Sequence, residues 1–145
     1  MHFVTGGAFN GKSAWVKNFY QLNEQEHLWI SAYKGYSLPG SFFGHVVVLE
    51  GIEEWLKNCH VNSSIDASRE EWQRLLQNWL AWEAGDPART FVVIGADITK
   101  GVVPADPGAR QWRDLTGWVY QDIAKFSSRV DLIWYGMSKQ LKQGE

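Results

Sequence analysis

Residues 6–13 carry a pattern whose residue types and spacing are typical of phosphate binding. They read Gly-Gly-Ala-Phe-Asn-Gly-Lys-Ser and fit G-x-x-x-x-G-K-[ST]. In such a loop the glycines let backbone N–H groups point at phosphate oxygens, Lys12 reaches the β- and γ-phosphates, and the Ser13 hydroxyl can ligate Mg²⁺. The sequence therefore predicts a nucleoside triphosphate site, against the alternative of a glycine-rich turn without function. Its residues are Gly6, Gly7, Ala8, Phe9, Asn10, Gly11, Lys12 and Ser13.

Two acidic residues, Glu50 and Asp97, follow apolar runs that we expect to be strands. Ligands of open parallel sheets bind beyond the carboxyl ends of the strands. A P-loop enzyme holds Mg²⁺ with the loop hydroxyl and an acid at a strand end, and transfer to a hydroxyl benefits from a carboxylate that accepts its proton. We predict that Glu50 and Ser13 hold Mg²⁺ with ATP or GTP, and that Asp97 orients or deprotonates the acceptor. The predicted catalytic set is therefore Lys12, Glu50 and Asp97; the alternative for both acids is a solvated loop acid or a helix cap.

Three cations flank the same predicted edge of the sheet: Lys100, Arg110 and Arg113. They are candidates for neutralising phosphate charge. The alternative is that they are ordinary surface cations that pair with Asp106 or Asp114. The Cys and His residues show no spacing typical of a metal site, so we expect none of that kind.

These side chains need a framework of strands and helices to bring them together. Apolar runs alternate with helical patterns, which implies a parallel sheet with right-handed crossovers. The expected strands are 2–5, 28–32, 45–49, 91–94 and 130–135, and the expected helices are 12–21, 52–58, 68–84 and 109–126. We therefore predict one domain over residues 1–145, a three-layer α/β, P-loop NTPase-like fold with a mainly parallel sheet of about five or more strands.

Two ends of these elements rest on specific signals. Ser68-Arg69-Glu70-Glu71 fits a capping box, so Ser68 is the expected N-cap of the long helix. The last ten residues are polar, and we expect them to be partly frayed. The segment 33–44 is rich in glycine and proline and is expected to be a loop.

Composition excludes several classes of partner. A formal charge of −2 and a pI near 6.1 give no electrostatic reason to expect nucleic acid or an anionic membrane. No apolar run approaches the length of about 18 residues that spans a bilayer, and no segment reads as a signal peptide. Cys59 is the single cysteine, which suits a reducing compartment. We therefore expect a cytoplasmic protein without a membrane span.

Several segments, taken together, resemble one enzyme family. They are 4–13 (similar to V-T-G-G-A-x-S-G-K-S), 48–56 (V-D-C-L-T-x-W-L), 94–104 (V-S-N-E-V-G-x-G-I-V-P), 110–121 (R-x-x-R-D-x-x-G-x-x-N-Q) and 136–142 (G-x-P-x-x-L-K). These motifs are similar to those of the bifunctional adenosylcobinamide kinase/adenosylcobinamide-phosphate guanylyltransferase (CobU-type) family of cobalamin biosynthesis. Glu50 stands where that family has Asp, and Asp97 stands where it has Glu.

One stretch of that family has no counterpart in this sequence. The family carries R-I-x-x-H-x-x-R-R-P-x-x-W between its second and third strands, and the His of that motif accepts GMP. Here the interval is the short segment 33–44, which lacks the motif. His45 lies near the gap but begins a strand, so we do not assign it that role. The resemblance therefore implies a kinase whose guanylyltransferase activity is lost.

The resemblance also implies a reaction and partners. The γ-phosphate of ATP or GTP would pass to the aminopropanol hydroxyl of adenosylcobinamide, a corrinoid, and a homo-oligomer is expected because family members assemble as trimers. Four aromatic residues of the loop, Tyr33, Tyr36, Phe42 and Phe43, are candidates for covering a corrinoid or base, against the alternative of packing within the loop. Two other functions stay open: a nucleotide-binding paralogue that acts through partner contacts, and a small P-loop kinase for another metabolite.

Overall fold

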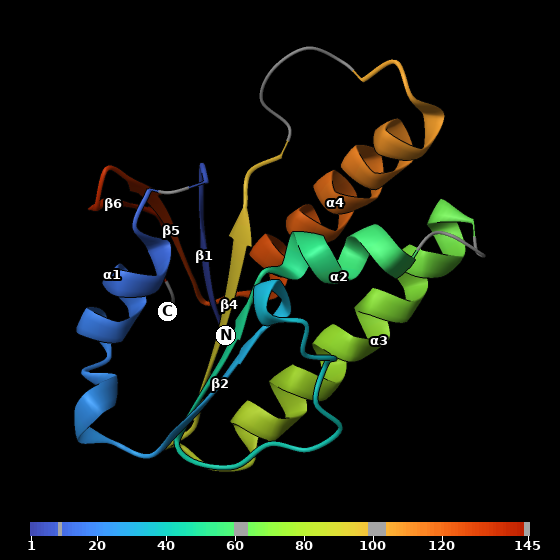
Figure 1. Ribbon diagram of the computed structural model, residues 1–145. Coiled ribbons are helices and arrows are strands. Elements are labelled where there is room, and N and C mark those ends of the chain that lie inside the picture. Colours follow the sequence, from blue (N-terminus) through green and yellow to red (C-terminus); the bar gives the residue numbers. More distant parts are fainter. Residues whose placement is uncertain (9, 60–63, 99–103, 144–145) are drawn as a thin grey trace.

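The computed structural model describes residues 1–8, 10–59, 64–98 and 104–143, and its centre is a six-stranded sheet (Figure 1). The order across the sheet is β2-β3-β4-β1-β5-β6. The strands are β1 (His2–Gly6), β2 (His27–Ser31), β3 (Val46–Glu50), β4 (Thr90–Ala96), β5 (Arg129–Trp134) and β6 (Met137–Lys142). Strands β1 to β5 pair in parallel, and β6 is antiparallel to β5. The predicted α/β fold with a mainly parallel sheet is confirmed.

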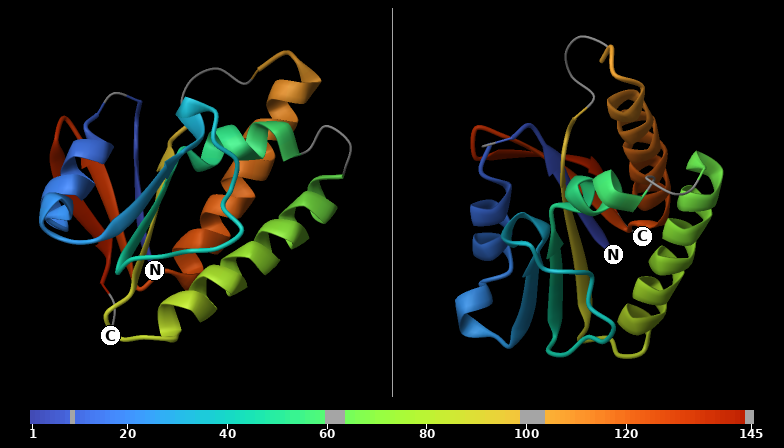
Figure 2. Two further views of the ribbon diagram at one scale, coloured as in Figure 1. Left: turned by 60° about the horizontal axis from the view of Figure 1, so that its bottom comes forward. Right: turned by 45° about the vertical axis from the view of Figure 1, so that its right-hand side comes forward.

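Helices cover both faces of the sheet and complete the three layers (Figure 2). Helix α1 lies on one face, and α2, α3 and α4 lie together on the other (Figures 1 and 2). The helices are α1 (Lys12–Phe19), α2 (Ile52–Cys59), α3 (Ile65–Ala84) and α4 (Pro107–Phe126), with 3-10 turns η1 (Leu22–Glu24) and η2 (Ala32–Lys34).

Strand β3 shows why its sequence is a continuous apolar run. Val46 and Val48 belong to the apolar cluster that contains Val16 of α1. Val47 and Leu49 belong to the cluster on the opposite face, which includes residues of α2, α3 and α4. Because successive side chains of a strand point to opposite faces, a strand covered on both sides needs apolar residues throughout.

The long helix α3 begins earlier than the capping box predicts. Its N-cap is Ser64, whose hydroxyl accepts a hydrogen bond from the Ala67 N–H at 3.1 Å. Ser68 lies inside the helix, where it is buried and its hydroxyl has no hydrogen-bond partner among the described residues. The prediction of Ser68 as N-cap is wrong because Ile65 packs against the core and extends the helix by a turn.

Most of the polar segment that is predicted to be partly frayed is a strand, over residues 137–142. Residues Met137–Lys142 form β6, and Trp134 pairs with Met137 across a two-residue turn. The Lys142 ammonium donates hydrogen bonds to the last carbonyls of α4, those of Ala124 and Lys125, at 3.1 and 2.9 Å. Backbone pairing along β5 thus orders a segment whose side chains are all exposed.

The topology brings three chain segments to one edge of the sheet. β4 and β5 flank β1, and β3 lies beside β4, so the carboxyl ends of these parallel strands share an edge. The loop after β1, Glu50 at the end of β3 and Asp97 after β4 therefore meet there. No helix among the described residues is long and apolar enough to cross a bilayer.

Candidate functional site

The loop between β1 and α1 needs glycine at two points for steric reasons. A Cβ at Gly6, whose φ is +149°, would lie 2.2 Å from the Ile133 carbonyl oxygen of β5. Gly11 is the N-cap of α1 with a φ of +87°, a left-handed conformation that side chains disfavour. Its carbonyl accepts the Trp15 N–H at 3.0 Å and so opens the helix. The glycines of the pattern thus shape the turn from strand to helix.

Lys12 lies against the loop to which it belongs. Its ammonium donates a hydrogen bond to the Gly7 carbonyl at 2.8 Å, and only 8% of the residue is exposed. Burial lowers the pKa of Lys12 from its ordinary value, while the nearby carboxylates of Glu53 and Glu50 oppose that shift. The Lys12 ammonium is therefore held against the loop, and the carboxylates of Glu50 and Glu53 lie near enough to compensate its charge.

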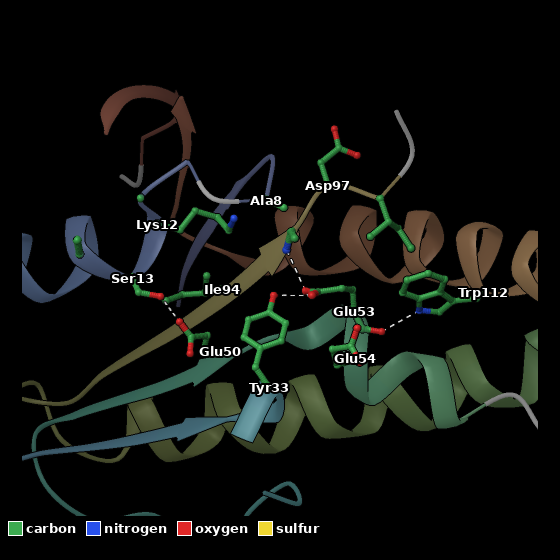
Figure 3. A pocket seen from close by; sticks show the side chains of 14 residues that line it. Ala8, Lys12, Ser13, Tyr33, Glu50, Glu53, Glu54, Ile94, Asp97 and Trp112 are labelled. Atoms are coloured by element: carbon green, nitrogen blue, oxygen red, sulfur yellow. Dashed lines mark hydrogen bonds between the residues drawn. The ribbon is translucent and has the colours of Figure 1, made fainter. Parts of the chain in front are cut away.

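Ser13 and Glu50 come from different elements and touch. The Ser13 hydroxyl of α1 donates a hydrogen bond to the Glu50 carboxylate at the end of β3 (Figure 3). The two predicted Mg²⁺ ligands thus lie together, and both are oxygen donors, which suits this hard cation. No group of three or more His, Cys, Asp or Glu among the described residues could hold a metal by itself. These residues fit a Mg²⁺ that is also bound by substrate phosphates, which is its usual mode.

Asp97 lies just past β4, where the sequence places it. Its backbone N–H donates to the Gly6 carbonyl at 2.8 Å, so the start of this segment is tied to the end of β1. The residue lines the same cavity as Lys12 and Glu50, and in Figure 3 its carboxylate points away from Glu50. The three predicted catalytic residues therefore border one cavity but do not form one cluster.

Glu53, in the first turn of α2, is a site residue that sequence reasoning missed. It is 4% exposed, and one carboxylate oxygen accepts the Ala96 N–H at 2.9 Å while the other accepts the Tyr33 hydroxyl at 2.5 Å. Its carbonyl accepts the indole N–H of Trp112 at 2.8 Å (Figure 3). The residue thus joins η2, α2, the end of β4 and α4 at the wall of the cavity.

The signal for Glu53 in the sequence is weak. It is an acid in the first helical turn after a strand end, where the helix dipole favours negative charge. Many such acids are exposed caps, so position alone does not separate a buried one from them. Only the tertiary contacts with Ala96 and Tyr33 do so.

A cavity of about 750 Å³ opens beside the loop, within the range of small-molecule sites. One wall comes from the loop and α1, and the others come from η2, α2, α4 and the ends of β3 and β4. Its lining residues are Ala8, Gly11, Lys12, Ser13, Ala14, Tyr33, Glu50, Glu53, Glu54, Ile94, Ala96, Asp97, Ile98 and Trp112. The cavity thus brings the predicted phosphate-binding loop together with acidic and apolar side chains of the other walls.

The loop aromatics divide between the two roles considered for them. Tyr33 lines the cavity. Phe42 packs against Trp82 and Phe91, with ring centroids 5.6 and 5.2 Å apart, as the packing alternative predicts. Tyr36 and Phe43 are exposed and are not part of the described lining.

Two of the three predicted cations, Arg110 and Arg113, lie away from the cavity. Arg113 lies 3.9 Å from the Asp114 carboxylate, which is the surface-pair alternative, and Arg110 is exposed. Neither belongs to the described lining of the cavity. Lys100 and Phe9 lie outside the described residues.

One family model matches this chain. Residues 40–141, well over half of the chain, match the family model described as cobinamide kinase / cobinamide phosphate guanyltransferase. No curated protein matches the chain. The matched region begins after residues 6–13 and includes Glu50, Glu53, Asp97 and Trp112, all of which line the cavity.

Proposed function

This chain belongs to the cobinamide kinase / cobinamide phosphate guanyltransferase family, and from that premise we propose that it is a kinase. It binds a nucleoside triphosphate at residues 6–13 and transfers the γ-phosphate to the aminopropanol hydroxyl of adenosylcobinamide. The observation that carries this proposal is the contact between Ser13 and Glu50, which line the cavity together with Lys12. This contact supports a site for phosphate and metal at the wall of the cavity, in which we place the acceptor.

In the proposed reaction the acceptor oxygen bonds to the γ-phosphorus as the bond to the bridging oxygen of the nucleotide breaks. Backbone N–H groups of the loop and Lys12 stabilise charge on the phosphoryl oxygens. Mg²⁺, held by Ser13 and Glu50, would neutralise charge on the phosphates. Asp97 orients the acceptor hydroxyl and takes its proton. The products are a nucleoside diphosphate and the phosphorylated corrinoid.

Glu53 has a positioning role in this proposal. Both of its carboxylate oxygens already accept hydrogen bonds, from the Ala96 N–H and the Tyr33 hydroxyl, so they are less suited to accept a proton from substrate. It holds the end of β4, directly before Asp97, against α2. Tyr33, which lines the cavity, is fixed by the same carboxylate.

We further propose that the guanylyltransferase half of the family's activity is absent. The segment 33–44 contains no histidine. His45 immediately precedes β3, at the end of that strand opposite Glu50, and the five residue steps between them correspond to roughly 16 Å. A histidine that accepts a nucleotide has to reach the phosphate loop, and His45 is at the other edge of the sheet.

The test is a transfer assay with γ-labelled ATP or GTP, Mg²⁺ and adenosylcobinamide. The wild type should label the corrinoid, and Lys12→Ala should reduce transfer by about 100-fold or more, because a charge-stabilising group is lost. Lys17→Ala is the matched control: it removes an exposed lysine of the same helix, which lies over the Trp29 ring, and should leave transfer unchanged.

Three outcomes separate the candidate functions. Nucleotide binding that is unaffected by Lys12→Ala would contradict the proposed site altogether. Binding that needs Lys12 but is followed by no transfer to any acceptor would instead support a nucleotide-binding paralogue that acts through partners. Transfer to a different hydroxyl compound would identify another metabolite kinase.

A further inference from the structure

The turn between β5 and β6 presents two aromatic rings to solvent beside the phosphate loop. Trp134 is 59% exposed and Tyr135 is 74% exposed. Their ring centroids are 5.6 Å apart with an interplanar angle of 25°, so the two rings are stacked on each other. Each ring therefore keeps one face that the other ring does not cover, and the core of the domain uses neither ring.

The backbone conformation of this turn is unfavourable for Tyr135. Tyr135 and Gly136 both have positive φ, at 52° and 72°, and they link the paired residues Trp134 and Met137. Asn, Asp and Gly are the usual residues at the first of these two positions. A tyrosine held in the left-handed region is strained, and such strain is concentrated at functional sites and ligand clamps.

The same turn is attached to the phosphate loop. The Gly136 N–H donates a hydrogen bond to the Asn10 carbonyl at 2.9 Å. A Cβ at Gly11 would lie only 3.4 Å from the Gly136 Cα. Figure 1 shows the tip of the hairpin next to the start of α1, and the right-hand view of Figure 2 agrees. The position of the aromatic pair is thus fixed relative to residues 10 and 11.

The hairpin lies on the side of the loop away from the cavity. Strand β1 lies between β4 and β5. The cavity is lined from β3, β4, α2 and α4, on the β4 side of β1, whereas the turn follows β5 on the other side. With the γ-phosphate placed toward the cavity, we infer that the nucleoside end of the nucleotide lies on the other side of the loop, where the hairpin is.

We propose that Trp134 and Tyr135 are the nucleobase platform of the nucleotide site, and that they bind a purine base by stacking. This rests on the proposed function, because it takes the phosphates to lie in residues 6–13. Every base has a π-face, so stacking alone discriminates little between bases. We therefore expect ATP and GTP to bind with similar affinity.

The test compares nucleotides with a probe that has no base. Calorimetric titrations with Mg²⁺ use ATP, GTP and inorganic tripolyphosphate, on the wild type and on Tyr135→Asn and Trp134→Thr. Each substitution should weaken ATP and GTP binding by about 5- to 150-fold, the range of a base–aromatic stack, and should leave tripolyphosphate binding unchanged. Leu141→Thr, which removes another exposed apolar side chain from the same hairpin, is the matched control and should change none of the three.

Tyr135→Asn also separates the platform from a structural role. Asn tolerates the left-handed conformation better than Tyr, so this variant should melt at the same or a higher temperature while nucleotide affinity falls. An equal loss of tripolyphosphate binding would overturn the proposal, because the turn would then serve only to shape the loop. Unchanged nucleotide affinity with an altered oligomeric state in sedimentation would overturn it in favour of a contact between copies of the chain. A wild type that binds neither nucleotide nor tripolyphosphate would refute the proposed function itself, and the platform with it.

Discussion

Replacement of Glu53 should destabilise the domain more than its place in a short helix suggests. Glu53→Ala leaves the Ala96 N–H without its acceptor, and Ala96 is only 8% exposed. The Tyr33 hydroxyl also loses its acceptor, but this residue is 51% exposed and water can replace the carboxylate. The loss of the Ala96 hydrogen bond should therefore reduce stability more than the loss of the Tyr33 hydrogen bond.

The magnitude follows from these contacts. An unpaired buried N–H that had bonded to a charged acceptor costs about 2–3 kcal/mol, and one lost buried methylene adds about 0.8 kcal/mol. Release of a buried carboxylate offsets part of this, so we expect Glu53→Ala to lower the free energy of unfolding by about 2–3 kcal/mol. Glu53→Gln keeps an acceptor for Ala96 and gives Tyr33 a donor, so it should cost only about 1 kcal/mol.

Urea denaturation measures both variants against Glu54→Ala, the neighbouring carboxylate, which should stay within about 0.5 kcal/mol of the wild type. A double-mutant cycle with Tyr33→Phe isolates the hydroxyl contact. The reasoning would be refuted if Glu53→Ala cost no more than Glu54→Ala, or if Glu53→Gln were as damaging as Glu53→Ala.

Three further predictions concern the framework of the site. Ser64→Ala should lower the free energy of unfolding by about 1 kcal/mol, because it removes the N-cap of α3. Ser68→Ala should be neutral or stabilising, because that buried hydroxyl has no hydrogen-bond partner among the described residues. The midpoints of urea denaturation compare the two variants. Gly6→Ala should lower the free energy of unfolding by more than about 3 kcal/mol, because its Cβ would meet a backbone oxygen. Gly117→Ala, in open space on α4, should raise it by about 0.5–1 kcal/mol in the same measurement. Similar values for the two variants would contradict the steric explanation of the loop. Burial lowers the pKa of His2 from its ordinary value of 6.5, so the unfolded chain binds this proton at a higher pH than the folded chain does. The stability that neutral His2 contributes is fully present above pH 6.5 and is lost as pH falls through the folded pKa, by up to about 1.4 kcal/mol per pH unit. A His2→Gln variant, with its free energy of unfolding measured at about pH 7.5 and 5.5, should lack this dependence.

The sequence predicts well the features that local chemistry determines. The apolar run 45–49 predicts a buried strand, and β3 is one. The glycines of residues 6–13 predict a tight turn, and Gly6 and Gly11 have positive φ between β1 and α1. The meeting of Ser13 and Glu50 also follows from topology, because parallel strands place their carboxyl ends at one edge.

The features that sequence reasoning missed depend on contacts distant in the chain. Ser64 and Ser68 both precede helical residues, and only the packing of Ile65 against the core decides between them. The polar segment 137–142 carries no apolar strand pattern, and it is ordered by its pairing with β5. The Tyr135-Gly136 pair was an available turn signal, although tyrosine is unusual at that position.

The central place of β1 has a consequence for the order in which the molecule forms. His2 pairs with Val92 on one side and with Arg129 on the other, so both neighbours of the first strand are synthesised long after it. At about 5–20 residues per second, β1 waits roughly 5–20 s for β4 and longer for β5. Strands β2 and β3 can pair meanwhile, because few residues separate them. The loop before Lys12 therefore becomes ordered only after β4 and β5 have been synthesised. In a ribosome-bound chain that ends before β4, β2 and β3 should be able to pair, but the turn from β1 to α1 should not yet be formed.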